Sequence, residues 1–299
     1  MLLESVLTGA VRGGTSILFP TLGEVVAERA GVINLGTEGC MLTGALAAYA
    51  VGVETGQPWL GVAAGMAVGA ILALLHAAMV VGRGANQIAT GLAITFLALG
   101  LTALFGQDYV GQGVVPVDPV AIPGLADLPL LGSVLFDHDP ITYASFVAPW
   151  LLWWLLFRSR LGMVVRAAGE RPEVLEAFGT SPELVRFGAV VFGGALAGLG
   201  GAQLATAFTL NWSENMTVGR GFVAVALVIF AAWDPRQAVV GAYLFSGSIS
   251  LQLQLQARGW EVSRYLLEAV PYLVVILALV ALSRRRRDAA PESLARVFG

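Results

Sequence analysis

Residues 55–82 read TGQPWLGVAAGMAVGAILALLHAAMVVG, without a single Asp, Glu, Lys or Arg. A helix needs about 20 apolar residues to cross a bilayer, so this stretch is long enough. Four further stretches lack these charges, at residues 84–107, 141–157, 187–213 and 237–257, and shorter apolar runs lie at 39–53, 221–233 and 269–283. The chain is 57% hydrophobic and 12% charged, whereas soluble domains carry about 25% charged residues. The sequence predicts an all-α, polytopic transmembrane helix bundle.

The apolar pattern predicts about nine spans, within a range of 8–10, in one membrane-spanning domain that uses residues 1–299. The first two candidates are blurred by Arg12 and by the adjacent Glu28 and Arg29, which leaves the side of the N-terminus open. The candidate spans are residues 5–26, 32–53, 59–82, 86–106, 140–157, 187–209, 217–233, 236–257 and 265–283.

Charge distribution predicts the orientation of the bundle. Residues 158–186 contain five arginines and four glutamates, and residues 284–287 are four consecutive arginines. The positive-inside rule places both in the cytoplasm. The connection at 107–139 is rich in aspartate and proline and has no arginine, which is typical of an external loop. Four candidate spans lie between the two basic regions, and this even number agrees with the assignment.

Several activities are excluded by missing residue types. The chain has no lysine, so it contains no P-loop, and ATP hydrolysis of that type would belong to another chain. One cysteine and two histidines give no metal site, cofactor site or catalytic pair that we can identify. We therefore expect a transport protein rather than an enzyme, with no catalytic residues, no metal and no cofactor.

Two short segments resemble each other, LGTEG at 35–39 and VGRGF at 218–222. Each begins a helix rich in small residues, which leads to a turn with Pro58 or Pro235. The predicted topology runs the two units in opposite directions, as in the inverted repeats of many transporters. With so few identities, chance explains the similarity equally well.

The first of these segments belongs to GVINLGTEG at residues 31–39, where Asn34 and Glu38 stand at the edge of an apolar helix. Glycines favour an unwound entry, and a carboxylate at membrane depth needs water or a partner. This pattern predicts that Asn34 and Glu38 line a solute pathway. Asn34 as a helix cap, with Glu38 in the first turn, explains the same residues.

Four motifs in order resemble one family. They are GVINLGTEGCMLTG at 31–44, NQIATGLAI at 86–94, RLGMVVRAAGERPEVLEAFG at 160–179 and ENMTVGRGFVAVALVIFAAWDP at 214–235. This set resembles the permeases of the branched-chain amino acid, ribose and nucleoside ABC importers, and is most similar to the simple-sugar and nucleoside branch. The resemblance implies a multi-pass permease in a prokaryotic cytoplasmic (inner) membrane that moves a small polar solute into the cell.

The resemblance also implies partners. Such permeases pair with themselves or with a sibling permease, sit on ABC ATPase subunits and receive solute from an external solute-binding lipoprotein. No nucleic acid is expected. The same resemblance identifies the 172–179 region as the helix that couples to the ATPase.

This region also has features of a short docking helix. Pro172 suits a first helical turn, the glutamates favour its N-terminal half and Gly179 suits its end. A solvated loop is the alternative, although it would leave apolar side chains exposed. The predicted coupling residues are Glu173, Val174, Leu175, Glu176, Ala177, Phe178 and Gly179.

Other polar residues stand at the starts of spans. They are candidates for the pathway, and a location at the headgroups explains them equally well. This second group comprises Asn86, Gln87, Thr90, Asn215 and Arg220.

Three functions compete. The motifs favour an ABC importer permease for a nucleoside or simple sugar, with a branched-chain amino acid permease as the alternative within the class. Glu38, Arg220 and Glu268 in or near spans leave an ion-coupled secondary transporter as an alternative from another class. A membrane enzyme is disfavoured because no catalytic constellation is visible.

Overall fold

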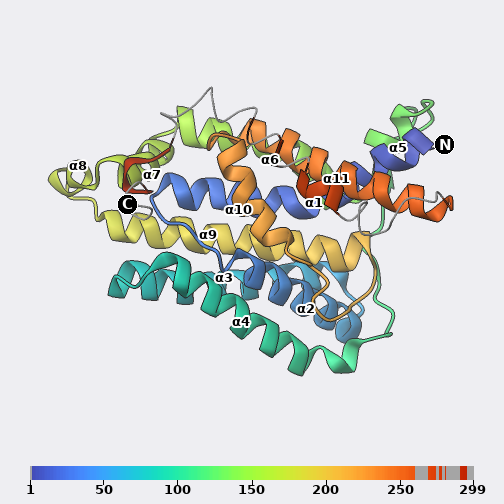
Figure 1. Ribbon diagram of the computed structural model, residues 1–299, viewed down its shortest axis with the longest axis horizontal. Helices are drawn as coiled ribbons and strands as arrows, with labels where there is room; N and C mark the ends of the chain where they lie inside the picture. Colours follow the sequence, from blue (N-terminus) through green and yellow to red (C-terminus); the bar gives the residue numbers. More distant parts are fainter. Residues whose placement is uncertain (1, 260–268, 274–275, 278–279, 281–289, 295–299) are drawn as a thin grey trace.

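The computed structural model of the chain describes residues 2–259, 269–273, 276–277, 280 and 290–294. These residues are mostly helical (Figure 1). The longer helices are α1 (Leu2–Arg29), α2 (Thr37–Thr55), α3 (Pro58–Arg83), α4 (Gln87–Phe105), α6 (Pro140–Arg158), α9 (Pro182–Gln203) and α11 (Pro235–Ala257). The shorter elements are η1 (Gln107–Tyr109), α5 (Leu131–Leu135), α7 (Arg160–Glu170), α8 (Pro172–Ala177), η2 (Leu204–Phe208), α10 (Arg220–Phe230) and the paired strands β1 (Val120–Ala121) and β2 (Asp137–His138).

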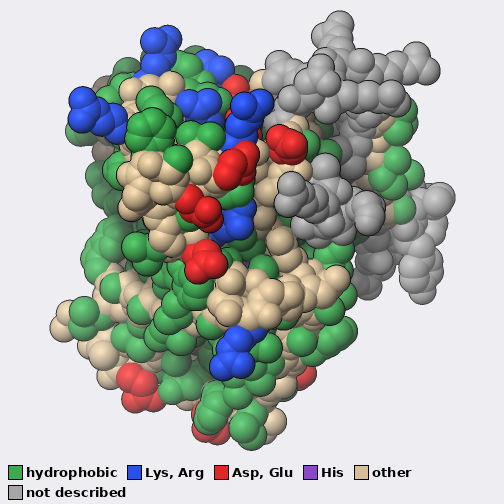
Figure 2. Space-filling view, turned by 90° about the vertical axis from the view of Figure 1, so that its left-hand side faces the viewer, with side chains coloured by type: hydrophobic (Ala, Val, Ile, Leu, Met, Phe, Trp, Pro, Cys, Tyr) green, Lys and Arg blue, Asp and Glu red, His purple; other side chains and the backbone are tan. Residues whose placement is uncertain are grey.

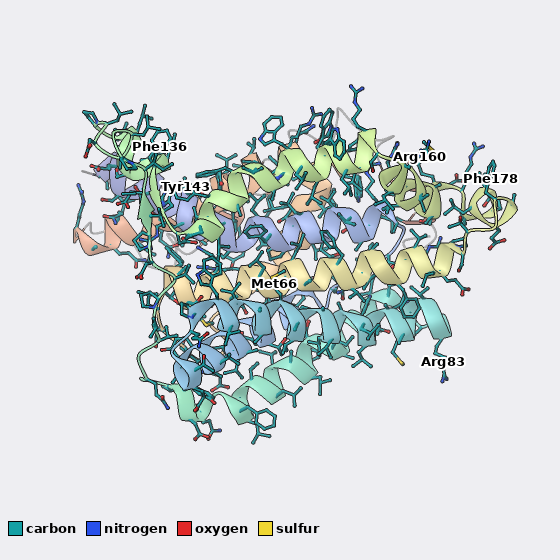
Figure 3. All side chains as sticks on the ribbon, turned by 180° about the vertical axis from the view of Figure 1, so that it is seen from behind. Met66, Arg83, Phe136, Tyr143, Arg160 and Phe178 are labelled. Atoms are coloured by element: carbon teal, nitrogen blue, oxygen red, sulfur yellow. The ribbon has the colours of Figure 1, made fainter. Side chains whose placement is uncertain are left out.

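The long helices run along one axis and give the bundle two ends. Phe136 and Tyr143 lie at one end, and Arg83, Arg160 and Phe178 lie at the other (Figure 3). We call these the α5 end and the α8 end, after the short helix found at each. Helix α1 begins at the α5 end and finishes at the α8 end (Figure 1).

The prediction of an all-α, polytopic bundle is confirmed. Within the described part of the chain, five helices are long and apolar enough to cross a membrane: α3, α4, α6, α9 with η2, and α11. Large apolar side chains such as Ile71, Phe96 and Trp150 are exposed on them, as lipid contact requires. Helix α1 contains five charged residues and is buried along most of its length, so this charged helix occupies the interior. The candidate span at 265–283 and the arginines at 284–287 lie mostly or wholly outside the described residues.

Glycines bring the central helices α3 and α9 close together. A Cβ added to Gly69 would lie 2.4 Å from the carbonyl oxygen of Gly194, and one added to Gly198 would lie 2.2 Å from that of Gly65. Without side chains at these positions, the two backbones approach to direct contact, which favours helix association in lipid. The glycines between residues 193 and 201 therefore serve packing.

Two helices begin inside the bundle, and their predicted spans at 32–53 and 217–233 are longer than the helices observed. The first break, residues 30–36, leads from the α8 end inward to the start of α2. The second break, residues 209–219, leads from the α5 end inward to the start of α10. Helix α10 has 11 residues, which at 1.5 Å per residue extend about 17 Å, roughly half the hydrocarbon thickness.

The two units α1–α2–α3 and α9–α10–α11 run in opposite directions. Helix α2 runs to the α5 end, where the hydroxyl of Tyr49 donates to the carbonyl of Gln112. Helix α10 runs to the α8 end, where Trp233 Nε1 donates to Glu28 of α1. Pro58 and Pro235 then begin α3 and α11. This arrangement agrees with the inverted relation between residues 35–39 and 218–222.

Candidate solute pathway and coupling surface

The first break is buried, and side chains of neighbouring helices pair its backbone. The N–H of Ile33 donates to Gln87 Oε1 of α4 at 2.8 Å, and the Ile33 carbonyl lies 3.0 Å from His76 Nε2 of α3. Thr95 Oγ1 of α4 donates to the Leu35 carbonyl at 3.1 Å. Irregular backbone is tolerated at membrane depth only with such partners. Gln87, predicted to line the pathway, therefore supports the backbone here.

A carboxylate of α1, Glu24, fixes the start of α2. It accepts hydrogen bonds from the hydroxyl of Thr37 and, at 3.3 Å, from the N–H of Asn34. The side chain of Asn34 in turn accepts from the N–H of Gly36 at 2.9 Å. Gly36, rather than Asn34, occupies the cap position of α2. Asn34 is 1% exposed and shapes the turn that leads into the helix.

Glu38, in the first turn of α2, binds the start of α10. Its Oε1 accepts from Thr217 Oγ1 at 2.5 Å and from the N–H of Gly219 at 2.9 Å, and its Oε2 accepts from the N–H of Gly221 at 2.6 Å. A carboxylate is favoured at this position because unpaired N–H groups and a positive partial charge gather at a helix N-terminus. Glu38 is 2% exposed, so it connects the start of α2 with the end of the second break inside the protein.

Arg220 extends from the same point. Its Nη1 donates to the Ser16 hydroxyl at 3.1 Å, about halfway along α1. The Glu38 carboxylate attracts the Arg220 guanidinium electrostatically, whereas its hydrogen bonds go to the backbone N–H groups on either side of Arg220. Arg220 also lines a cavity of about 340 Å³ beside α10 and α11. The structure thus brings two predicted pathway residues, Glu38 and Arg220, to one place.

The remaining predicted pathway residues lie apart from this point. Asn86 is exposed at the α8 end and caps α4, accepting from the N–H of Ala89 at 3.0 Å. Thr90 lies one turn further, in an apolar groove between α3 and α4. Asn215 is exposed in the second break. These three residues therefore do not share a site with Glu38.

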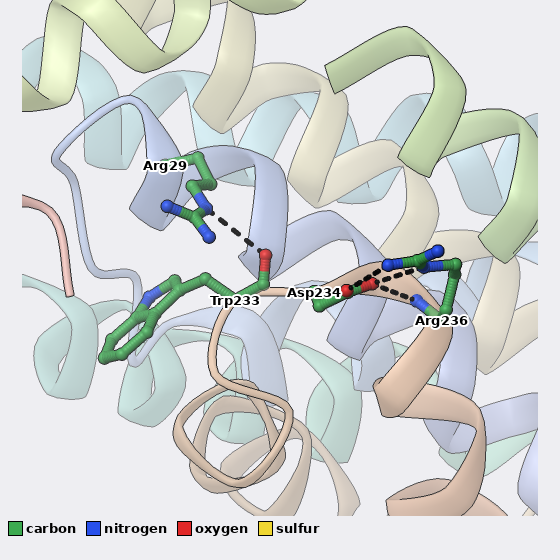
Figure 4. Close-up of polar contacts among 4 residues, drawn as sticks. All are labelled: Arg29, Trp233, Asp234 and Arg236. Atoms are coloured by element: carbon green, nitrogen blue, oxygen red, sulfur yellow. Dashed lines mark hydrogen bonds and ion pairs between the residues drawn. The ribbon is translucent and has the colours of Figure 1, made fainter. Parts of the chain in front are cut away.

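A second carboxylate of α1, Glu28, was not predicted to have a role. It is 2% exposed and accepts from Trp233 Nε1 at 2.6 Å. Arg29 Nε donates to the Trp233 carbonyl at 3.2 Å (Figure 4). Glu24 and Glu28 are four residues apart and so share one helix face. Two carboxylates at this spacing within a membrane segment were the sequence signal that could have indicated buried polar roles for them.

Asp234 and Arg236 complete the turn between α10 and α11. The Asp234 carboxylate accepts from Arg236 N at 2.9 Å, Nε at 3.2 Å and Nη2 at 2.9 Å (Figure 4). The Arg236 guanidinium carbon lies 4.2 Å from the ring centroid of Trp153 on α6. These contacts fix the end of α10 at the α8 end, while Glu38 holds its start.

Helix α8 projects from the α8 end (Figure 1). Phe178 is 83% exposed and Val174 41% exposed, whereas Leu175 is 6% exposed and packs into the protein. Glu173, Glu176, Ala177 and Gly179 are exposed, and Gly179 has a φ of 74° that ends the helix. Of the predicted apolar contacts, Val174, Ala177 and Phe178 are accessible to a partner and Leu175 is not.

Arginine side chains gather over the α8 end (Figure 2). The exposed ones are Arg83, Arg158, Arg160 and Arg171. In the 106–139 connection at the α5 end, the exposed charged residues Asp108, Asp118, Asp127 and Asp137 are all acidic. The α8 end thus combines exposed arginines with the exposed glutamates Glu170, Glu173, Glu176 and Glu183, whereas the described part of the 106–139 connection exposes acidic charge alone.

A bundle with two helices that begin at its centre and run in opposite directions is the architecture of a membrane transport protein. The family model described as "Branched-chain amino acid transport system / permease component" matches residues 6–279, and the chain belongs to this family. It is a multi-pass protein of the cytoplasmic membrane and a permease component of an ABC importer, which is a transport component and not an enzyme.

Three relatives cover most of the chain. It is 41% identical to the putative glucose ABC transporter permease of Haloferax volcanii, over 84% of this chain and 78% of the relative. Identity to the guanosine ABC transporter permease of Bacillus subtilis is 33%, over 88% of this chain and 87% of the relative. Identity to the nucleoside ABC transporter permease of Lactococcus lactis is 28%, over 93% and 92%. No solved structure matches the chain.

Proposed function

We propose that this permease carries a nucleoside or a simple sugar into the cell, along a path that passes the junction of α2 and α10. The observation that carries this proposal is the convergence of two helix starts on Glu38, beside Arg220 and a cavity. Interrupted helices that expose N-termini at membrane depth form the solute sites of many transporters. The names of the glucose, guanosine and nucleoside relatives support the solute class.

The α8 end is the cytoplasmic end in this proposal, and α8 is the helix that docks on a separate ABC ATPase. Residues 158–186 form the coupling loop, and residues 107–139 form the external loop. The exposed arginines at the α8 end support this orientation. So does the exposure of Phe178, because a large aromatic side chain in water is typical of a partner surface. A second permease subunit and an external solute-binding lipoprotein complete the importer.

Uptake by cells carrying chromosomal variants tests the docking role. Phe178→Ser should abolish uptake of labelled guanosine or glucose at an unchanged amount of protein in the membrane. Phe105→Ser is the matched control, because Phe105 is 61% exposed at the other end of the bundle. Normal uptake with Phe178→Ser would reject the docking role, and uptake of leucine alone would reject the solute class.

Labelling of a cysteine introduced at Phe178 tests the orientation. The native Cys40 is fully buried and should not react. A membrane-impermeant thiol reagent should label the variant in inside-out vesicles and not in intact cells. Labelling in intact cells would place α8 outside and remove the basis for coupling to a cytoplasmic ATPase.

A further inference from the structure

The cavity beside Arg220 has a composition that distinguishes between the candidate solutes. It measures about 340 Å³ and lies between the start of α10, the face of α11 and the segment at 269–273. This volume is at the lower end of the range for small-molecule pockets, about 300–1,000 Å³. The residues that matter for its chemistry are Arg220, Phe245, Ile249, Gln252 and Tyr272.

Two aromatic rings form one wall. Phe245 of α11 is 2% exposed and backs the wall, whereas Tyr272 is 48% exposed and supplies the accessible aromatic surface. Their ring centroids lie 5.7 Å apart, and their planes meet at 74°. This edge-to-face contact supports the Tyr272 ring, on which a flat ring can stack.

Among the described lining residues, three side chains can form hydrogen bonds. Arg220 supplies donors and is oriented by its bond to Ser16, while Gln252 and the Tyr272 hydroxyl each supply a donor and an acceptor. Phe245, Ile249 and Val218 offer none. A hexose carries hydroxyls around its whole ring, and a buried hydroxyl without a partner costs about 1–3 kcal/mol. A planar base has apolar faces and places its polar groups on its edge.

We propose that this cavity receives the base of a nucleoside as the solute passes the junction. The base stacks on Tyr272, which Phe245 supports from behind, and Arg220 and Gln252 bind its polar edge. Stacking on aromatic side chains contributes about 1–3 kcal/mol per base and tolerates different bases. The assignment rests on the proposed transport function and selects nucleosides over simple sugars within it.

Protection of an introduced cysteine tests the site directly in the full-length chain. Gln252→Cys places a thiol on the cavity wall, and the native Cys40 is fully buried. Gln254→Cys is the matched control, because Gln254 is a half-buried glutamine of the same helix that does not line the cavity. Both variants must show the wild-type elution profile and thermal unfolding in lipid nanodiscs.

The rate of reaction with a small methanethiosulfonate reagent is measured with uridine, guanosine, glucose or leucine present. A probe at about four times its Kd leaves a fifth of the sites free, and so slows the reaction about fivefold. Uridine and guanosine should protect the thiol at 252 to this degree, glucose and leucine should not, and the thiol at 254 should be unaffected. Tyr272→Leu, combined with Gln252→Cys, should weaken the protection by both nucleosides.

Two results would overturn the assignment and leave the transport function standing. One is protection by glucose, and the other is an absence of protection by nucleosides at about 10 mM, the range of very weak binding, while nucleoside uptake in cells still depends on the chain. If deletion of the chain changes uptake of none of these solutes, the proposed function itself fails. Uptake and protection therefore separate the two proposals.

Discussion

Both breaks place irregular backbone inside the bundle, but side chains of neighbouring helices support the first break far more than the second. In the first break every residue except Leu35 is buried, and helices α1, α3 and α4 all contribute partners to it or to the start of α2. The second break is mostly exposed, and the side-chain bonds at its inner end converge on Glu38.

Backbone conformation follows the same division. The positive φ in the first break belongs to Gly31, at 94°, where glycine is unstrained. In the second break, Leu210, Asn215 and Val218 have φ values of 51°, 55° and 47°. Such conformations cost free energy in residues other than glycine and persist where other contacts hold them. The first break is therefore a fixed support, whereas the second is a strained element that Glu38 holds at its inner end and the buried Trp212 holds further out.

Removing the Glu38 carboxylate should produce the largest effect. Glu38→Leu leaves the N–H groups of Gly219 and Gly221 unpaired near the Arg220 charge, and we expect a loss of about 3–5 kcal/mol in the free energy of unfolding. Glu38→Gln keeps an acceptor oxygen and should lose less. Thermal unfolding in nanodiscs measures both.

Glu54→Gln is the control for this substitution, because Glu54 is an exposed acid near the other end of α2. It should change the unfolding midpoint little. An equal loss with Glu54→Gln and Glu38→Leu would mean that Glu38 does not hold α10, and the contrast between the two breaks would then be lost.

The sequence predicted the first break and missed the second. Glycines beside Asn34 favoured an unwound entry there, Arg220 fell within a predicted span at 217–233, and apolar length located α3, α4, α6, α9 and α11. The sequence did not indicate the side chains that support each break. It did not separate Asn86 from Gln87. These neighbours point in different directions, one capping its own helix and the other reaching Ile33, and only tertiary packing sets that distinction.

Long-range contacts account for the rest. Glu24 accepts a hydrogen bond from Thr37, and Glu28 accepts one from Trp233. Both donors lie outside α1, so the sequence of α1 alone does not reveal these bonds. Likewise Phe245 and Tyr272 lie near Arg220 only in the folded bundle, so the aromatic wall of the cavity was not visible from local motifs. Leu175 illustrates the limit within one short helix, since spacing alone did not reveal which apolar side chain faces inward.

Crowding the junction tests its geometry without changing charge. A Cβ at Gly221 would lie 2.4 Å from the Glu38 Cα, so Gly221→Ala forces two backbones apart and should cost about 1–3 kcal/mol. Gly188→Ala on α9 meets nothing within 4 Å and should be neutral or slightly stabilising. Comparable unfolding midpoints for the two variants would show that α2 and α10 do not meet as closely as described.

Substitutions of Gln87 test whether its side chain supports the first break. Gln87→Leu leaves the buried Ile33 N–H without its acceptor, and a loss of about 1–2 kcal/mol is expected. Gln87→Glu retains an acceptor and should recover much of that loss. Asn86→Ala removes an exposed cap and should cost about 1 kcal/mol or less. If Asn86→Ala destabilises the protein more than Gln87→Leu does, the first break does not depend on side chains from α4.

The smallest expected effect has the opposite sign. Val218 is β-branched, 65% exposed and held at a φ of 47°, so Val218→Gly relieves strain while removing little burial. Left-handed backbone costs roughly 1–2 kcal/mol in such residues, and the added freedom of glycine in the unfolded chain offsets about 0.5–1 kcal/mol. We therefore expect a net stabilisation of about 0.5–1 kcal/mol, measured as a higher unfolding midpoint. If the strain helps the second break to release from Glu38 during transport, the same variant should slow uptake even as it raises stability. A stabilised variant with unchanged uptake would assign the strain to packing alone.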